Sequence, residues 1–271
     1  MSDAIRGKTI LITGATGGIG LACARALVGS GARLLLHGRD KGKLRMARQE
    51  TIRLGADAET FIADLSSLEE TAAFAREVVH EGLDVLINNA GIGFGRDGNK
   101  RELSRDGHEL RFAVNYLAPF LLSAELLSSG APKVAVINVA SAGQEALDFD
   151  DLMTERGYSG VRAYCRSKLA LIMMSFDLAA LHPSLQVQAL HPGTYLDTGM
   201  VREAGITPLG PVSQGVESIL AVLTAALGGG ASGGYFDRTR PARALAQAYN
   251  TADRQRLREV SLRLVAPWCS A

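Results

Sequence analysis

The sequence predicts an α/β fold in which a parallel sheet of about seven strands carries helices on both faces. Two observations along its 271 residues support this prediction. Short apolar runs alternate with amphipathic stretches from one end of the chain to the other, which is typical of strand–helix–strand units. The runs up to residue 190 are nearly continuously apolar, as expected of parallel strands that are buried on both faces. We therefore expect a doubly wound, Rossmann-type arrangement.

The predicted elements follow one another in a regular order. Strands are expected at Thr9–Thr13, Arg33–His37, Glu59–Ala63, Val85–Asn88, Val134–Asn138, Val187–Leu190 and Tyr235–Phe236. Helices are expected at Ile19–Val28, Lys41–Arg53, Ser67–Glu81, Arg105–Ser128, Arg162–Leu181 and Pro211–Ala226. No linker, repeat or low-complexity tract divides the chain, so residues 1–271 are expected to form a single domain. From about residue 242 the sequence is charged and predicts a C-terminal tail of one or two helices.

The composition argues against several classes of protein. The 29 basic and 28 acidic residues leave a formal net charge of +1, whereas nucleic-acid binders usually carry a basic excess or stripe. Three cysteines without paired spacing, and no cluster of His, Cys and Asp at ligand spacing, predict neither a disulfide framework nor a metal site. The sequence contains no charged leader and no apolar run of about 18 residues. We therefore expect a soluble, cytoplasmic protein without a membrane partner.

A glycine-rich turn directly follows the first predicted strand and opens the first predicted helix. It reads Thr13-Gly14-Ala15-Thr16-Gly17-Gly18-Ile19-Gly20. Glycines at such a place allow a tight turn and let backbone N–H groups approach a diphosphate at the helix N-terminus. The spacing of Gly14, Gly18 and Gly20 departs from G-x-G-x-x-G, so the position of the turn indicates a nucleotide site more than its pattern does. The alternative is a purely structural turn.

The end of the second predicted strand bears on which nicotinamide cofactor would be used. An acid at this strand end would bind ribose hydroxyls and repel a 2′-phosphate, but the position holds Gly38. Arg39 follows, with Lys41 and Lys43 nearby, and its guanidinium can stack on adenine and pair with a phosphate. This set favours NADP(H) over NAD(H). Against it, Asp40 comes next, and Arg39 could be a solvated loop charge.

Further motifs follow in an order that is more specific than any one of them. They are Asp64-Leu65 after the third strand, Asn88-Asn89-Ala90-Gly91 after the fourth, Asn115, Ser141, Tyr164-Cys165-Arg166-Ser167-Lys168, and His191-Pro192-Gly193 after the sixth. With the glycine-rich turn, they make nearly the whole chain resemble the short-chain dehydrogenase/reductase family. Within the family, the chain resembles the retinol-dehydrogenase-like branch most. The stretches that carry this resemblance are Asp106-Gly107-His108-Glu109, Phe112-Ala113-Val114-Asn115, Asp150-Asp151-Leu152 and Ser167-Lys168-Leu169-Ala170.

The resemblance implies an enzyme that transfers hydride to or from a nicotinamide cofactor. It implies catalytic roles for Asn115, Ser141, Tyr164 and Lys168. It implies cofactor contacts for Gly14, Thr16, Gly17, Gly18, Ile19, Gly20, Arg39, Asp64, Leu65, Asn89, Ala90, Gly91, Tyr164, Lys168, Pro192 and Gly193. One position departs from the family pattern. Many relatives have a threonine four residues after the glycine of Pro-Gly, whereas this chain has Asp197 there and Thr198 one position later. Relatives commonly pair through the helices around Asn115 and Tyr164, so the resemblance suggests a homodimer or homotetramer.

One face of the fifth predicted helix carries the expected acid–base chemistry. Tyr164 and Lys168 lie four residues apart and so share that face. A free tyrosine, with a pKa of about 10, is a poor base at neutral pH, and a neighbouring ammonium favours its phenolate. Tyr164 would protonate a carbonyl oxygen in reduction or deprotonate an alcohol in oxidation, while Ser141 would hydrogen-bond the same oxygen. By resemblance, Lys168 would hold the nicotinamide ribose and Asn115 would bind a proton-relaying water.

Each of these residues, taken alone, has a structural alternative. The pair on the helix could be a chance spacing, Ser141 could cap a helix, and Asn115 could be a buried amide bonded to backbone. At the level of the whole protein, two further classes stay open. One is a nucleotide-binding redox sensor or scaffold without turnover, and the other is an epimerase or dehydratase that uses the same residues.

The predicted substrate region is apolar. Substrate should lie beyond the carboxyl ends of the strands, where the segments Ile92–Arg96, Ala142–Val161 and Thr194–Thr207 gather. Their apolar and aromatic residues are Phe94, Leu147, Phe149, Tyr158, Tyr195, Leu196 and Met200. This set favours a bulky, largely apolar ketone, aldehyde or secondary alcohol as the small-molecule partner.

Overall fold

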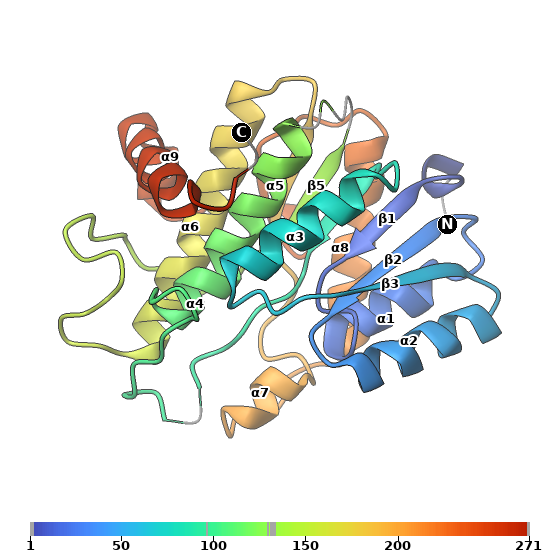
Figure 1. The fold of residues 1–271 in the computed structure, drawn as a ribbon, viewed down its shortest axis with the longest axis horizontal. Helices are drawn as coiled ribbons and strands as arrows, with labels where there is room; N and C mark the ends of the chain where they lie inside the picture. The colour runs from blue at the N-terminus through green and yellow to red at the C-terminus, as the bar shows by residue number, and fades with distance from the viewer. Residues whose placement is uncertain (1–2, 96, 129, 131–133, 270–271) are drawn as a thin grey trace.

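The computed structural model describes residues 3–95, 97–128, 130 and 134–269 and places their strands in one sheet (Figure 1). The strands are β1 (Thr9–Ile12), β2 (Arg33–Gly38), β3 (Asp57–Ile62), β4 (Val85–Asn88), β5 (Ala135–Val139), β6 (Gln186–His191), β7 (Gly234–Asp237) and β8 (Arg240–Pro241). Their order is β3-β2-β1-β4-β5-β6-β7-β8, and every neighbouring pair is parallel except β7 with β8. The predicted fold class is confirmed, because the order reverses between β1 and β4 as in a doubly wound sheet.

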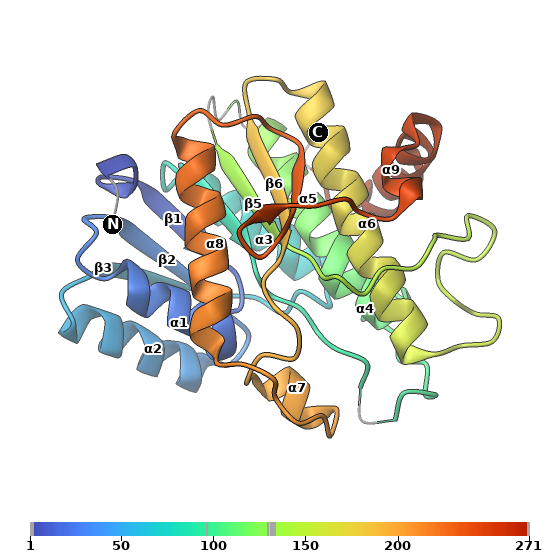
Figure 2. The ribbon, with the colours of Figure 1, turned by 180° about the vertical axis from the view of Figure 1, so that it is seen from behind.

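Helices cover both faces of this sheet (Figure 2). One face carries α1 (Gly18–Leu27), α2 (Lys41–Arg53) and α8 (Val212–Leu227), and the other carries α3 (Leu68–Val79), α5 (Ala118–Ser128) and α6 (Gly160–Leu181). In β1, Ile10 and Ile12 pack toward α1 and α8, while Leu11 packs toward α3 and α5. Successive side chains of a strand point to opposite faces, so a strand with a helical layer on each side is apolar throughout.

Two element predictions are wrong, and each has a local cause. The third strand is expected to be buried on both faces, but β3 is an edge strand with alternating burial. Its exposed Asp57 and Glu59 pair with Arg33 of the neighbouring β2. The helix expected from residue 105 begins only with α4 (Leu110–Phe112), because Gly107 adopts a φ of 81° in the preceding turn. Glu109 then caps the helix by accepting a hydrogen bond from the Phe112 backbone N–H.

The helix that starts at α4 continues through the π-helical turn η2 (Ala113–Leu117) into α5. The stretch Leu110–Ser128 has the length and hydropathy of a helix that could cross a membrane, yet 83% of it is buried inside the fold. It packs between α3 and α6. Its apolar character on all sides is therefore explained by burial in the protein core.

The C-terminal region packs against α6 (Figures 1 and 2). After the 3₁₀ turn η3 (Ala246–Tyr249), the chain forms α9 (Thr251–Val265), as the charged tail predicts. The Tyr116 hydroxyl lies 2.7 Å from Ser261 Oγ, with both groups buried, and Arg258 pairs with Asp177 of α6 at 2.6 Å. The tail is thus joined to the core by specific polar contacts as well as by apolar packing. Two further short elements, η1 (Asp3–Ile5) and α7 (Gly199–Glu203), complete the described chain.

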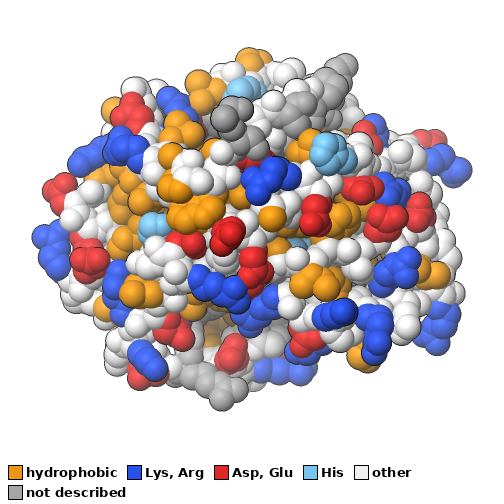
Figure 3. All heavy atoms as spheres, in the orientation of Figure 1, with side chains coloured by type: hydrophobic (Ala, Val, Ile, Leu, Met, Phe, Trp, Pro, Cys, Tyr) orange, Lys and Arg blue, Asp and Glu red, His pale blue; other side chains and the backbone are white. Residues whose placement is uncertain are grey.

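Charges of both signs are interspersed on the face seen in Figure 3, in line with the near-neutral composition. Across the described residues, no three His, Cys, Asp or Glu side chains gather where they could hold a metal ion. Cys23, Cys165 and Cys269 are free thiols. Burial raises the pKa of Cys23 to about 12, so this thiol is an inert part of the core.

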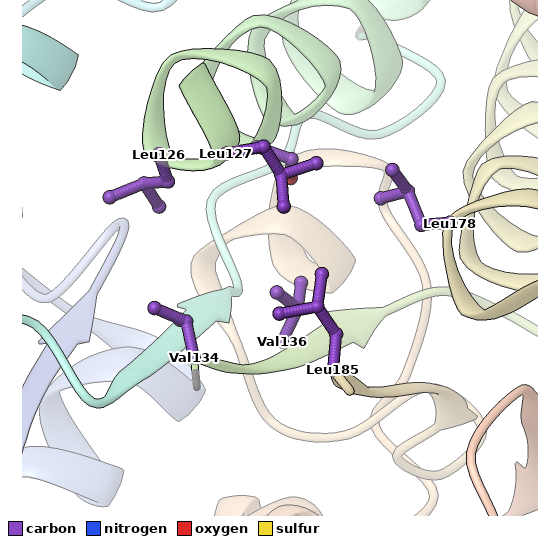
Figure 4. Close-up of a pocket in the computed structure, with 7 residues that line it drawn as sticks. Leu126, Leu127, Val134, Val136, Leu178 and Leu185 are labelled. Carbon is purple, nitrogen blue, oxygen red and sulfur yellow. The ribbon is translucent and has the colours of Figure 1, made fainter. Parts of the chain in front are cut away.

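A small apolar cavity of about 10 Å³ lies between α5, β5 and α6 (Figure 4). Its lining residues are Ser123, Leu126, Leu127, Val134, Val136, Leu178 and Leu185. A cavity this small holds one water at most, and an apolar lining offers that water few partners. The side chains around it consequently lack part of the contact that a filled core would give.

Filling this cavity should stabilise the protein. Val136→Ile adds one methylene toward the gap and is expected to raise the free energy of unfolding by about 0.5–1 kcal/mol. Val187 is the matched control, because it pairs with Val136 in the sheet, is fully buried and does not line the cavity. Val187→Ile should overpack and cost about 1–3 kcal/mol. Urea unfolding of both variants measures this, and equal effects would contradict the assignment of the cavity.

Candidate active site

A cleft of about 720 Å³ opens at the carboxyl ends of the parallel strands. This is where a doubly wound sheet binds ligands, next to the reversal of strand order between β1 and β4. It is lined by these predicted site residues: Gly14, Thr16, Gly17, Gly18, Ile19, Arg39, Asp64, Leu65, Asn89, Ala90, Gly91, Ser141, Tyr164, Lys168, Pro192 and Gly193. Two predicted residues, Gly20 and Asn115, lie behind the cleft wall instead.

The glycine-rich turn is held in close contact with the segment after β4. Gly14 has a φ of 70°, and a Cβ there would lie 2.9 Å from Ala90 Cα. The side-chain amide of Asn89 donates to Thr13 O at 2.8 Å, and Thr13 Oγ1 accepts the backbone N–H of Asn89. A Cβ at Gly20 would overlap Gly14 O and the Asn89 amide. Gly20 therefore serves the packing of α1 against the turn, and the cofactor contact expected of it stays a prediction.

The N-terminus of α1 is open to the cleft. Gly17 stands at the capping position and provides no side chain, so the first-turn N–H groups have no side-chain cap. Gly17, Gly18 and Ile19 all line the cleft. Uncapped N–H groups at a helix N-terminus, together with the positive end of the helix dipole, form a suitable site for a diphosphate.

His37 of β2 is a site residue that the sequence analysis missed. Its Nδ1 accepts the Gly14 N–H at 3.3 Å, so its Nε2 carries the proton donated to Ala63 O at 3.1 Å. The ring also stacks on Phe74 at a centroid distance of 4.5 Å. Burial lowers the pKa of His37 to about 4, which keeps the imidazole neutral. A neutral ring thus links the glycine-rich turn to the end of β3.

The end of β2 is built without a carboxylate facing the cleft. A Cβ at Gly38 would overlap Thr16 Cγ2, so the glycine and the threonine of the turn fit each other. Asp40 caps α2 by accepting the Lys43 N–H at 2.9 Å and does not line the cleft. Arg39 is exposed, lines the cleft and has no ion pair among the described residues.

Three of the four predicted catalytic residues meet at the floor of the cleft. Tyr164, on α6, packs its ring edge-on against Phe94 at 4.9 Å and interacts with the Ser141 hydroxyl. Burial raises the pKa of Tyr164, and the hydrogen bond with Ser141 opposes this. The buried Lys168 ammonium lies 5.8 Å from the Tyr164 ring centroid and donates to Val139 O at 2.8 Å. Burial lowers the pKa of Lys168 to about 8.

Asn115 occupies the middle of the π-helical turn η2 and supports the cleft wall from behind. Its Oδ1 accepts the Ile92 N–H at 2.8 Å, and its Nδ2 donates to Ile92 O and to Ser167 Oγ. A Cβ at Gly91 would lie 3.2 Å from Asn115 Oδ1 and 3.5 Å from Lys168 Nζ. The side chain therefore fixes the segment after β4 beside Lys168. Apolar periodicity gave no sign of the π turn, a feature that often accompanies functional sites.

The loop after β6 closes the far side of the cleft. Thr198 lies beside the glycine-rich turn, 3.4 Å from the place of a Cβ on Gly18, and its hydroxyl caps α7 by accepting the Val201 N–H. Asp197, the residue at the departing family position, pairs outward with Arg202 at 2.8 Å. Thr198 thus lines the cleft one position later than the family pattern has its threonine, with its methyl group toward Gly18 and its hydroxyl on α7.

The predicted substrate residues fall into two groups. Phe94, Tyr195, Leu196 and Met200 line the cleft. The other three do not: Leu147 and Phe149 pack in the core cluster around α6, and Tyr158 bonds Arg111 at 3.1 Å. Arg96, part of a predicted lining segment, lies outside the described residues.

Arg111 is a second site residue without a sequence signal. Its guanidinium is almost fully buried, donates to Gly93 O and Phe94 O at 3.1 and 3.2 Å, and pairs with Glu102 at 2.8 Å. It therefore fixes the backbone that presents Phe94 to Tyr164.

Comparison with known proteins agrees with this geometry. A model of the short-chain dehydrogenase family matches residues 8–208. The chain is 38% identical to mouse retinol dehydrogenase 14 over 209 residues, which are 70% of this chain and 61% of the relative. It is 37% identical to human retinol dehydrogenase 13 over 229 residues, 77% of this chain and 67% of the relative. The chain thus spans about three-fifths of the length of retinol dehydrogenase 14.

Solved structures give the same result. An uncharacterised protein of Mycobacterium paratuberculosis superposes with a TM-score of 0.75 at 26% identity, covering 98% of this chain and 97% of that one. A short-chain dehydrogenase from Sphingobium yanoikuyae in complex with NADPH gives 0.66 at 27% identity, covering 81% and 85%. The chain belongs to the short-chain dehydrogenase/reductase family. Within that family it falls in the branch that resembles the retinol dehydrogenases.

Because His37 is buried neutral, stability should depend on its protonation. Its pKa is about 4 in the folded protein and about 6.5 when unfolded, so the unfolded chain binds the proton more strongly. The contribution of this group to the free energy of unfolding should be fully present above pH 6.5. It should be lost progressively as the pH drops from 6.5 to 4, by about 3 kcal/mol.

His37→Asn keeps a neutral acceptor for the Gly14 N–H and provides the control. Denaturant unfolding of both proteins between pH 4 and 7 measures the difference in slope, in which all other titrating groups cancel. Parallel pH curves for the two proteins would contradict the role assigned to His37.

Proposed function

We propose that the protein is an NADP(H)-dependent oxidoreductase that reduces a carbonyl group on, or oxidises an alcohol of, a bulky and largely apolar small molecule. The observation that supports this most is the meeting of Ser141, Tyr164 and Lys168 on the floor of a cleft whose other end is the glycine-rich turn. A protein that only senses a nucleotide has no need for an acid–base tyrosine beside a desolvated lysine. The relatives named as retinol dehydrogenases support the same reaction class.

The side chains divide the work as follows. When bound, the cofactor supplies or accepts hydride at its nicotinamide ring. Tyr164 holds the proton that the substrate oxygen gains in reduction and takes it back in oxidation. Ser141 donates a hydrogen bond to that oxygen as negative charge develops on it. Lys168 lies close enough to favour the phenolate of Tyr164 by its charge.

Three features of the cleft support NADP(H) as the cofactor. Arg39 stands unpaired at the end of β2, and the ammonium groups of Lys41 and Lys43 follow within one turn of α2 without ion pairs among the described residues. Gly38 offers no carboxylate, and the overlap of a Cβ with Thr16 opposes adding one. Asp40 is occupied as the cap of α2. A 2′-phosphate at the end of β2 would therefore meet positive charge, and Asp64, an acid that also lines the cleft, interacts electrostatically with Arg39.

The substrate end of the cleft supports an apolar ligand. Phe94, Tyr195, Leu196 and Met200 line it, and Val161, half exposed, lies at its rim. Apolar walls with a few convergent polar groups are typical of sites for apolar small molecules. Retinol, named in the relatives, is a substrate of this kind, and so are bulky ketones.

The proposed reaction is tested by following reduced cofactor spectroscopically with a panel of apolar ketones and aldehydes. Wild type should turn over with NADPH, and Tyr164→Phe should lose at least a hundredfold in kcat because the proton donor is gone. Cys165→Ala, next in the chain and also lining the cleft, is the control and should keep most of the activity. Undiminished turnover by Tyr164→Phe would refute the mechanism. No net change in reduced cofactor, with interconversion of the substrate, would indicate an epimerase.

Cofactor choice is tested separately at Arg39. Arg39→Ala should raise KM for NADPH about tenfold, as expected for loss of a charged contact to phosphate, and leave KM for NADH within twofold. Arg45→Ala, which removes an exposed arginine of α2 that does not line the cleft, should change neither value. Equal effects on both cofactors would show that Arg39 does not read the 2′-phosphate.

A further inference from the structure

The segment that carries Ser141 depends on distant partners for its shape. Residues 140–159, between β5 and α6, contain no helix or strand. The carbonyl oxygen of Ser141 nevertheless accepts two hydrogen bonds, from the Tyr235 hydroxyl at 2.9 Å and from the side-chain amide of Gln144 at 3.1 Å. Its side-chain oxygen accepts the Gly143 N–H at 3.0 Å. Hydrogen bonds therefore fix both the main chain and the side chain of Ser141.

The tail strengthens this arrangement through two side-chain amides. Gln144 Oε1 accepts the Leu245 N–H at 2.7 Å. In the tail, the Gln247 side chain accepts the Leu147 N–H at 2.6 Å and donates to Leu147 O at 3.1 Å. Residues 141–147 are thus fastened to residues 245–247, about a hundred positions further along the chain. The matched family region ends at residue 208, so Tyr235 and these tail residues lie beyond it.

Resting on the proposed function, we infer that Tyr235 is a positioning residue for the reaction: its hydroxyl fixes the Ser141 carbonyl and so directs the Ser141 side chain toward the substrate oxygen. Tyr235 itself is buried in β7 and does not line the cleft, so it acts only through Ser141. A hydroxyl that must meet a developing alkoxide is sensitive to small displacements, since misplacement by about 1 Å can cost up to a hundredfold in rate. The C-terminal part of the chain thereby belongs to the active-site architecture.

The test compares two tyrosines that each lose one buried hydrogen bond. Tyr235→Phe removes one of the two donors to the Ser141 carbonyl and leaves Gln144 as the other, whereas Tyr116→Phe breaks the bond to Ser261 beneath α9, away from the cleft. Tyr235→Phe should lower kcat for reduction of an apolar ketone roughly tenfold and leave KM for NADPH within twofold. Amide hydrogen exchange in residues 140–148 should also become faster. Tyr116→Phe should keep the wild-type kcat and the wild-type exchange in this segment.

Each outcome decides the question. A kcat for Tyr235→Phe no lower than that of Tyr116→Phe, or unchanged exchange in residues 140–148, would overturn the inference. If Tyr235→Phe does not fold, Gln144→Met removes the other donor to the same carbonyl and should produce the same loss in kcat. Failure of the proposed function would appear as absent turnover in wild type or undiminished turnover in Tyr164→Phe. The hydrogen-exchange comparison does not depend on turnover, so it tests the role of Tyr235 in either case.

Discussion

The close contact between the glycine-rich turn and the strand ends beside it is the constraint on which the whole cleft depends. Gly14 lies against Ala90, so β1 and β4 meet backbone to backbone where the sheet reverses its order. Asn89 and His37 then fix the turn from two sides through bonds to Thr13 and Gly14. A larger residue at Gly14 would push the two strands apart and move every group that follows them.

Most of the side chains around the cleft are held by hydrogen bonds to main-chain atoms. Lys168 donates to Val139 O, Asn115 holds both backbone groups of Ile92, and Arg111 holds the carbonyls of Gly93 and Phe94. Backbone positions in a packed sheet vary little, so such contacts place side chains more reproducibly than contacts between two flexible side chains. The low exposure of Lys168 and Arg111 follows from this arrangement.

The sequence predicted the elements and site residues that local patterns mark, and it missed the residues whose roles depend on contacts between distant segments. The apolar runs predicted β1, β2 and β4 to β6 because strands between two helical layers are apolar throughout. Motif order found Ser141, Tyr164 and Lys168, since their neighbours in sequence mark the strand ends and the helix. His37 and Arg111 gave no signal, because their roles come from partners 26 and 18 residues away. The packing role of Gly20 gave no separate signal, since a glycine that permits packing and one that permits ligand approach look alike in sequence.

The position of α9 bears on how copies of the chain could assemble. The homodimer or homotetramer that the family resemblance implies, paired through the helices around Asn115 and Tyr164, stays a prediction. In this structure the outer side of α6 is occupied by the protein's own C-terminal helix. Assembly through that face would have to displace α9 and break the Tyr116–Ser261 and Asp177–Arg258 contacts. The C-terminal helix therefore covers surface of α6 that a second subunit would need if it approached from this side.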